Sequence, residues 1–158
     1  MKRLLLFSVL VFIGGITATL LFAAISDSPA EKLWKRITVE TPYSHWHHLD
    51  NHLSGKKSGT PYAPYYRIYV NNISNKSGKM LADFGTIFVR ENLSAEKILQ
   101  GLTVMYKIEG YNSEAGDWFW AKYSAEGQVE EAGKVKECLG CHSFAADSDY
   151  IFDHNLQR

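Results

Sequence analysis

The sequence predicts a mainly β domain of the α+β class, in which short helices lie at the edges of an antiparallel sheet. Four segments rich in β-branched and aromatic residues are typical of strands: 66–70, 85–90, 102–108 and 117–123. The connections between them contain no long helical pattern, which favours antiparallel pairing over parallel βαβ units. The chain has 8 Phe, 9 Tyr and 4 Trp, which suits a β-rich core or a lined pocket.

Two short helices are expected outside the sheet. Ser28-Pro29-Ala30-Glu31 has the form of a capping box with Pro at the first helical position, and apolar residues follow at helical spacing. This pattern predicts a helix over residues 29–38. A second helix is expected over 134–144, and residues 150–152 are expected to add an edge strand. The stretch 41–64, which is rich in His, Gly, Ser and Pro, reads as a loop.

The first residues resemble a targeting segment. Lys2 and Arg3 precede an uncharged run of 22 residues from Leu4 to Ile25. A cleaved leader has an apolar stretch of roughly 7–15 residues, whereas a membrane-spanning helix needs about 20. Both a signal peptide and an uncleaved anchor therefore stay open, and either one places the domain in the periplasm. No other membrane contact is expected.

The chain divides into a targeting segment over 1–26, a helix with a His-rich loop over 27–64, and a main domain over 65–158. Without Lys2 and Arg3, the remainder carries 15 basic and 17 acidic residues. This balance leaves no basic surface of the kind that binds nucleic acid.

The two cysteines of the chain form the pattern Cys138-Leu139-Gly140-Cys141-His142. The pattern C-x-x-C-H is the attachment site of a c-type haem. Cysteines at positions i and i+3 lie on one side of a helical turn, where two thioether bonds can tether a haem, and the adjacent histidine supplies the proximal ligand to its iron. The sequence thus predicts one covalent haem c near the C-terminus of the sheet domain.

Three other readings of the cysteine pair are weaker. A thioredoxin-like redox pair would lie in a βαβ setting, and a zinc site would need two more ligands at similar spacing. A simple disulfide is the third alternative. Export agrees with haem attachment, because c-type haem is attached outside the cytoplasm.

The sixth coordination position of the iron decides the chemistry. Electron-carrying cytochromes have Met or His there, and the candidates in this chain are Met80, Met105 and the loop histidines 45, 47, 48 and 52. Met105 lies among apolar strand residues and suggests core packing, and the polar loop suggests solvated histidines. We therefore expect an open sixth position and the binding of a small molecule.

Several blocks of the sequence together resemble the cytochrome P-460 family. The resemblance covers roughly residues 65–154 and rests on the following segments: Ile68-Tyr69-Val70-Asn71, Gly85 to Asn92, Thr103 to Lys107, Gly110-Tyr111-Asn112, Gly116 to Tyr123, Cys138-x-x-Cys141-His142 and Asp149 to Phe152. It implies a β-rich monohaem protein, usually a homodimer, with a five-coordinate iron. Some members oxidise hydroxylamine, while the cytochromes c′-β bind nitric oxide without that activity. A redox partner cytochrome is also implied for an oxidising member.

The same resemblance directs attention to two further positions. Hydroxylamine oxidisers of the family have a lysine bonded to the porphyrin edge, and Lys79 has the matching spacing ahead of Gly85. An ordinary loop lysine is the alternative. The oxidisers also use a distal carboxylate six residues before the first haem cysteine, where this chain has Ala132. Glu131 is adjacent, but a slip of one residue turns a strand side chain to the other face. The alanine therefore argues against turnover.

Other residues near the motif have structural readings beside functional ones. Arg67 and Arg90 are candidate partners of the haem propionates, since a guanidinium binds carboxylates bidentately, although surface exposure is the ordinary expectation. Trp118 and Trp120 are expected on one face of their strand, with Phe119 and Tyr123 on the other. One of these sets is expected in the core and the other beside the haem.

Overall fold

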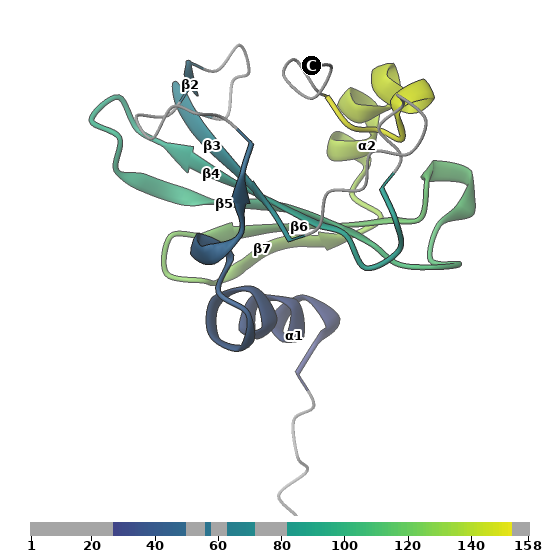
Figure 1. Cartoon of the computed structure of the whole chain (residues 1–158), viewed down its shortest axis with the longest axis horizontal. Helices are drawn as coiled ribbons and strands as arrows, with labels where there is room; N and C mark the ends of the chain where they lie inside the picture. The colour runs from purple at the N-terminus through teal and green to yellow at the C-terminus, as the bar shows by residue number, and fades with distance from the viewer. Residues whose placement is uncertain (1–26, 50–55, 58–62, 72–81, 153–158) are drawn as a thin grey trace, which may run out of the picture.

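The computed structural model describes residues 27–49, 56–57, 63–71 and 82–152. They form an antiparallel sheet with the N-terminal helix below it and the C-terminal helical segment above it in the view of Figure 1. The predicted targeting segment 1–26 lies outside the described residues. Within the described ranges, no helix is both long enough and apolar enough to span a membrane.

The sheet confirms the mainly β, antiparallel prediction. Its order is β1-β3-β4-β5-β6-β7, with β2 paired to β3, and all pairings are antiparallel. The strands are β1 (His47–His48), β2 (Lys56–Lys57), β3 (Tyr65–Val70), β4 (Ile87–Leu93), β5 (Leu99–Lys107), β6 (Trp118–Ser124) and β7 (Val129–Gly133). The four predicted strands correspond to β3, β4, β5 and β6. The region read as a loop contains the two-residue strands β1 and β2.

The helical segments are α1 (Pro29–Lys35), a π-helical turn (Arg36–Glu40), 3₁₀ turns at Tyr43–His45 and Ser113–Ala115, α2 (Lys136–His142) and a 3₁₀ segment (Ser143–Ser148). The helix predicted over 29–38 is confirmed with its capping box. Glu31 accepts a hydrogen bond from the Ser28 backbone N–H at 2.6 Å, and the Ser28 hydroxyl accepts one from the Glu31 N–H at 3.2 Å. The helix predicted over 134–144 is shorter than expected and continues as the 3₁₀ segment.

Two features differ from the sequence prediction. The edge strand expected at 150–152 is absent, because Asp149 and Tyr150 have φ values of +56° and +62°, which an extended strand does not allow. Instead, β7 is an edge strand of the described sheet. Its sequence Val-Glu-Glu-Ala-Gly has little intrinsic strand preference, so the pairing with β6 decides its conformation.

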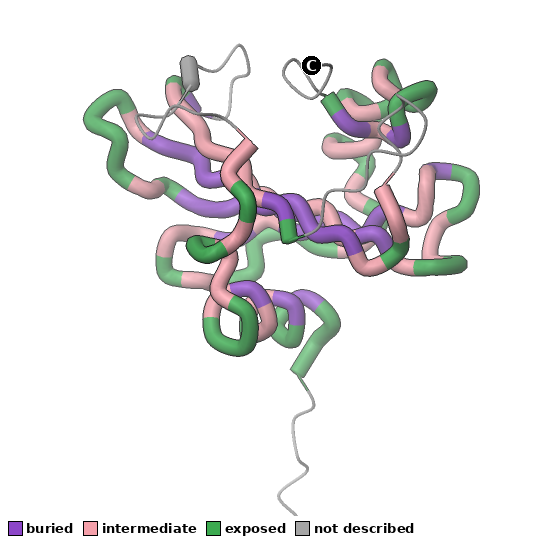
Figure 2. Tube along the Cα trace, in the orientation of Figure 1, coloured by how far each residue is buried: buried purple, intermediate pink, exposed green. Residues whose placement is uncertain are grey.

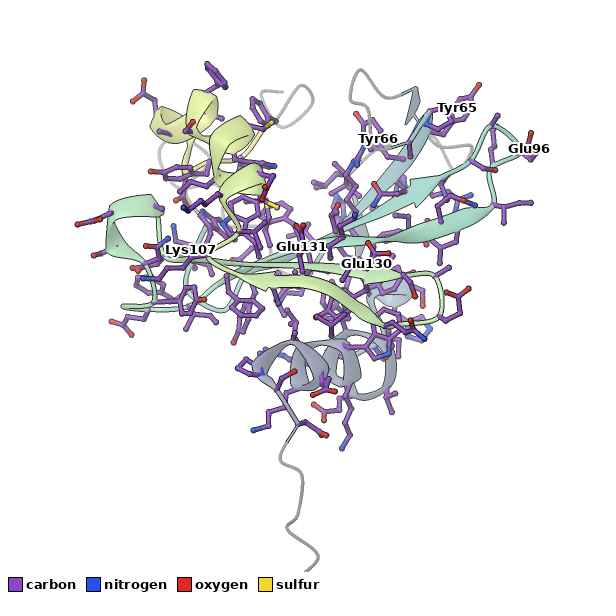
Figure 3. The ribbon with its side chains drawn as sticks, turned by 180° about the vertical axis from the view of Figure 1, so that it is seen from behind. Tyr65, Tyr66, Glu96, Lys107, Glu130 and Glu131 are labelled. Atoms are coloured by element: carbon purple, nitrogen blue, oxygen red, sulfur yellow. The ribbon has the colours of Figure 1, made fainter. Side chains whose placement is uncertain are left out.

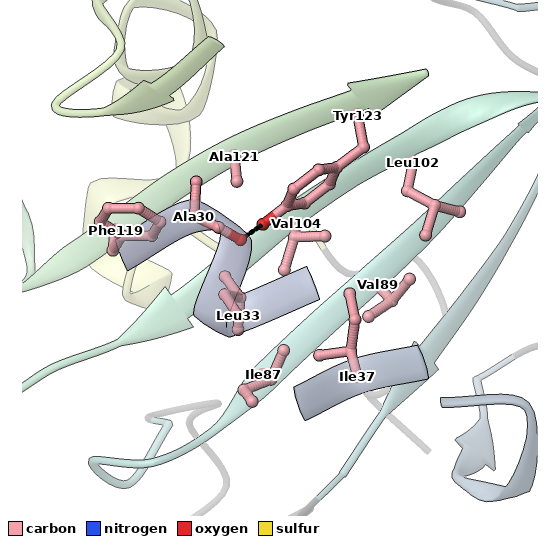
Figure 4. Packing of buried hydrophobic residues seen from close by; sticks show 10 residues of the cluster. All are labelled: Ala30, Leu33, Ile37, Ile87, Val89, Leu102, Val104, Phe119, Ala121 and Tyr123. Carbon is pink, nitrogen blue, oxygen red and sulfur yellow. Dashed lines mark hydrogen bonds between the residues drawn. The ribbon is translucent and has the colours of Figure 1, made fainter. Parts of the chain in front are cut away.

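The sheet separates two apolar clusters, and Figure 2 shows the buried residues concentrated in its central strands. On one face, α1 packs onto the sheet, and the Tyr123 hydroxyl donates to the Ala30 carbonyl at 2.7 Å (Figure 4). The second cluster, here called the haem-motif face, lies opposite. Its buried members are Val70, Phe88, Trp118, Trp120 and Ile151, and Cys138 packs against them. We predicted that Trp118 and Trp120 lie on one face of their strand and that Phe119 and Tyr123 lie on the other. The two clusters confirm this prediction.

Candidate functional site: a haem-attachment helix on an aromatic sheet face

Helix α2 carries the complete cysteine-histidine pattern. Cys138 and Cys141 both lie within this single helix and are three residues apart, as thioether attachment requires. Cys138 is half-buried, Cys141 is exposed, and neither forms a disulfide. One thiol position thus lies against the aromatic sheet face and the other at the surface, where a haem can bridge them.

His142 is held in a defined orientation. Its Nδ1 atom lies 2.6 Å from the backbone carbonyl oxygen of Tyr150, and its ring packs against Trp120 and Phe152 at centroid distances of 4.6 and 5.1 Å. A carbonyl can only accept, so the proton of the neutral ring belongs on Nδ1. The lone pair of Nε2 is then left for a metal, which is the usual arrangement of a ligand histidine.

Burial keeps His142 in the form that a metal binds. Burial lowers the pKa of His142 below its ordinary value, and the nearby Arg90 charge lowers it further. The hydrogen bond to the Tyr150 carbonyl raises this pKa, but its effect is smaller than that of burial. A histidine that is neutral at physiological pH can coordinate iron without first losing a proton.

The thiols fit haem attachment better than the competing readings. Burial, followed by the charges of Glu131 and Glu137, raises the pKa of Cys138 to about 11. Reactive redox cysteines depend on a thiolate, which the surroundings of Cys138 disfavour. Within the described part of the chain, no group of three or more Cys, His, Asp or Glu side chains could hold a metal ion.

The two candidate arginines lie on opposite faces. Arg90 belongs to the haem-motif face: it pairs with Asn92, lies 4.7 Å from the centre of the Tyr66 ring, and acts electrostatically on His142. Arg67 lies on the α1 face, where its guanidinium binds Glu91 at 2.8 Å. The propionate role expected for Arg67 therefore does not fit the structure, because alternation along β3 turns its side chain away from α2.

The strand register also separates Glu131 from Ala132. Glu131 pairs with Lys122 and Ala132 with Ala121, and residues directly opposite in an antiparallel pair share a face. Since Ala121 belongs to the α1 cluster, Ala132 faces α1, and Glu131 faces the side of Trp120 and α2 (Figure 3). The register thus turns Ala132, the position matched to the family's distal carboxylate, toward α1, and Glu131 is an acidic residue on the haem-motif side of β7.

Some predicted candidates lie outside the described residues: Lys79, Met80 and His52. Met105 packs against the cluster of the haem-motif face, which confirms the expectation that it is a core residue. His45 lies in the Tyr43–His45 turn, while His47 and His48 form β1, where the His48 ring contacts Tyr69 at 5.0 Å.

One buried polar atom supports the presence of a bound group. Trp120 is 3% exposed, and no described residue accepts a hydrogen bond from its Nε1–H. A buried donor without an acceptor is unfavourable. Because this indole packs on His142, a haem or its ligand is a suitable source of the acceptor.

The structure adds two residues that the sequence analysis did not select. Lys107 forms a buried ion pair with Asp149, next to the carbonyl group that holds His142. Both residues belong to segments that carry the family resemblance, which was the available signal. Their pairing could not be found from the sequence, since 42 positions separate them.

A helix with two thiols and an oriented neutral histidine, set on an aromatic sheet face, is the arrangement expected of a c-type haem-attachment site. The comparison with family models then gives the particular family. Residues 41–153 match the model described as Cytochrome P460. The chain belongs to the cytochrome P-460 family and is a haem cytochrome of that family, which confirms the resemblance seen in the sequence. No curated protein matches the chain.

Proposed function

We propose that this protein is an exported monohaem c-type cytochrome that binds nitric oxide, hydroxylamine or a similar small nitrogen ligand at a five-coordinate iron. The observation that carries the proposal is the geometry of His142. Its Nδ1 is occupied by the Tyr150 carbonyl, its Nε2 is available, and the two cysteines of the motif lie on the same helix.

The haem, when bound, supplies a redox-active iron that can take a small ligand. Cys138 and Cys141 would hold it by thioether bonds, and His142 would orient it from the proximal side. Arg90 is suited to a haem propionate, because its guanidinium lies on this face and its charge acts on His142. Lys79 is the candidate for a porphyrin cross-link by its spacing in the sequence.

Glu131 is the candidate base for hydroxylamine oxidation. The oxidation removes protons from the substrate, and a general base must lie within hydrogen-bond reach of it. Two observations support this role. Glu131 lies on the haem-motif face, and its charge contributes to the raised pKa of Cys138. In turnover, Glu131 would accept protons, and an external cytochrome would accept the electrons.

Two alternatives give different results in experiments. A cytochrome c′-β-like protein would bind nitric oxide without turnover, and a plain electron carrier would have a sixth ligand from Met80 or a loop histidine. Periplasmic location, with or without tethering through residues 4–25, and assembly as a homodimer complete the proposal. The low net charge gives no support to nucleic acid as a partner.

The proposal is tested on the full chain produced with haem-attachment machinery. The haem should stay with the protein through acid-acetone extraction, and replacing Cys138 and Cys141 with Ala should release it. The ferric form should be high-spin, and the ferrous form should bind nitric oxide and carbon monoxide. Extractable haem in the unmodified protein contradicts covalent attachment. A low-spin resting spectrum that changes in Met80→Leu supports the electron carrier instead.

A further inference from the structure

A buried ion pair includes Asp149, which directly precedes Tyr150 in the chain, and the Tyr150 carbonyl is the group that contacts the His142 ring. Lys107 on β5 pairs with Asp149, and their side chains are only 11% and 8% exposed. The other Asp149 carboxylate oxygen accepts from the Ala82 backbone N–H at 2.9 Å. Trp118 donates its indole N–H to the Asp149 carbonyl at 2.9 Å, and the Lys107 ammonium lies 5.0 Å from the Trp118 ring centre. The side chain and the backbone carbonyl of Asp149 are thus both bound by residues of the haem-motif face.

This anchoring holds an unfavourable backbone conformation. Asp149 and Tyr150 have left-handed φ values of +56° and +62°. Two consecutive non-glycine residues rarely adopt this conformation unless their surroundings impose it. The result of the turn is that the Tyr150 carbonyl points back at His142, with 2.6 Å between its oxygen and Nδ1.

We infer that Lys107 and Asp149 are positioning residues for the proximal histidine, a role that rests on the haem binding proposed above. The ion pair fixes the 149–150 turn, and the turn fixes the Tyr150 carbonyl as the acceptor of the His142 Nδ1 proton. A well-placed acceptor holds the tautomer and the ring orientation and makes the ligand more basic. A more basic imidazole favours ferric over ferrous iron, so this pair sets the reduction potential from a distance.

The decisive variant is Lys107→Met, which keeps most of the apolar length of the side chain and removes its charge. If Lys107 acted only through its charge, its loss would favour the ferric state and lower the potential. If it acts as a positioning residue, the turn loosens, the hydrogen bond weakens and the potential rises. The expected shift in the ferric-to-ferrous equilibrium is on the order of tenfold, which is about 59 mV for a one-electron couple. The iron-histidine stretching frequency of the ferrous protein should fall.

A matched control exists on the other face of the sheet. Arg67 and Glu91 form an ion pair whose side chains are 25% and 12% exposed. Arg67→Met should lower thermal stability but leave the potential and the iron-histidine frequency unchanged. If Lys107→Met does not fold, the uncharged double variant Lys107→Met/Asp149→Asn takes its place, since Asn tolerates the left-handed conformation.

The haem content of the unmodified protein is measured first. Protein without covalent haem overturns the proposed function and this inference with it. A haem-loaded variant whose potential and frequency equal those of the unmodified protein overturns only the positioning role. A lowered potential in Lys107→Met also overturns only the positioning role, because it shows that Lys107 acts through its charge alone.

Discussion

Glu131 lies directly opposite Lys122 in the pairing of β6 and β7, and this places its side chain on the face of Trp120 and the haem motif. The next residue, Ala132, faces helix α1 instead. The pairing passes through a bulge, because Lys122 pairs with Glu131 while Tyr123 pairs with Val129. The bulge decides which of the neighbouring residues is available to a ligand on the haem-motif face.

The first prediction concerns these two positions in hydroxylamine oxidation. Glu131→Gln should lower the steady-state rate by about 10²–10⁴-fold, because it removes the general base and keeps the size of the side chain. Ala132→Glu should not raise the rate, since its carboxylate would face α1. Activity is measured with an artificial electron acceptor, and nitric oxide binding to the ferrous protein is the control. A rate increase in Ala132→Glu would contradict this assignment.

The second prediction compares the two arginines. Arg90→Gln should lower the reduction potential, because a positive charge near a haem and its propionates stabilises the reduced state. Arg67→Gln should leave the potential unchanged, since this residue pairs with Glu91 on the opposite face. Redox titrations of the two variants check both statements. Equal shifts in the two variants would show that neither arginine acts locally on the haem.

The third prediction concerns Lys79, which lies outside the described residues. A bond from its nitrogen to the porphyrin would distort the ring and change its electronic levels. Proteolysis and mass spectrometry of the holoprotein should then find a fragment that joins Lys79 to the Cys138–Cys141 haem peptide. Lys79→Arg should lose this fragment and show an ordinary c-type spectrum. If the unmodified protein lacks the fragment, the cytochrome c′-β alternative is favoured.

The fourth prediction concerns the thermodynamics of the Lys107–Asp149 pair. Lys107→Met should lower the free energy of unfolding by about 3–5 kcal/mol, because it leaves a buried carboxylate without its counter-charge. Lys107→Met/Asp149→Asn should recover part of this loss, since neither group is then charged. Denaturant unfolding of the holoprotein variants gives the comparison. A double variant less stable than Lys107→Met would show that the charge of Asp149 contributes stability without its partner.

The fifth prediction is the pH dependence of the α1 capping box. Hydrogen bonds from the Ser28 backbone and hydroxyl lower the pKa of Glu31 below 4.5. A carboxylate whose pKa is lower in the folded state contributes stability above its unfolded pKa and loses it as the pH falls through the folded value. Glu31→Gln should therefore reduce the thermal stability at pH 7, because it removes the carboxylate that accepts from the Ser28 backbone N–H. The difference from the unmodified protein should shrink as the pH falls through the folded-state pKa of Glu31, as measured by thermal unfolding.

The sequence alone determined the local features of this protein. Strand composition and alternation predicted β3 to β6, and the capping box predicted α1, because these signals lie within a few neighbouring residues. The motif around Cys138, Cys141 and His142 was equally local, and its helical setting is confirmed. The family resemblance was also readable, since it rests on several blocks in a fixed order.

The tertiary structure decided the features that depend on distant partners. Pairing with β6 makes β7 a strand, and the bulge in that pairing, invisible in the sequence, turns Glu131 rather than Ala132 toward the haem motif. The ion pair of Lys107 with Asp149 joins a strand to a turn 42 residues away, and the turn replaces the expected edge strand. Long-range pairing overrides local preference at these positions, because the burial and hydrogen bonding gained there exceed the cost of an unfavourable backbone.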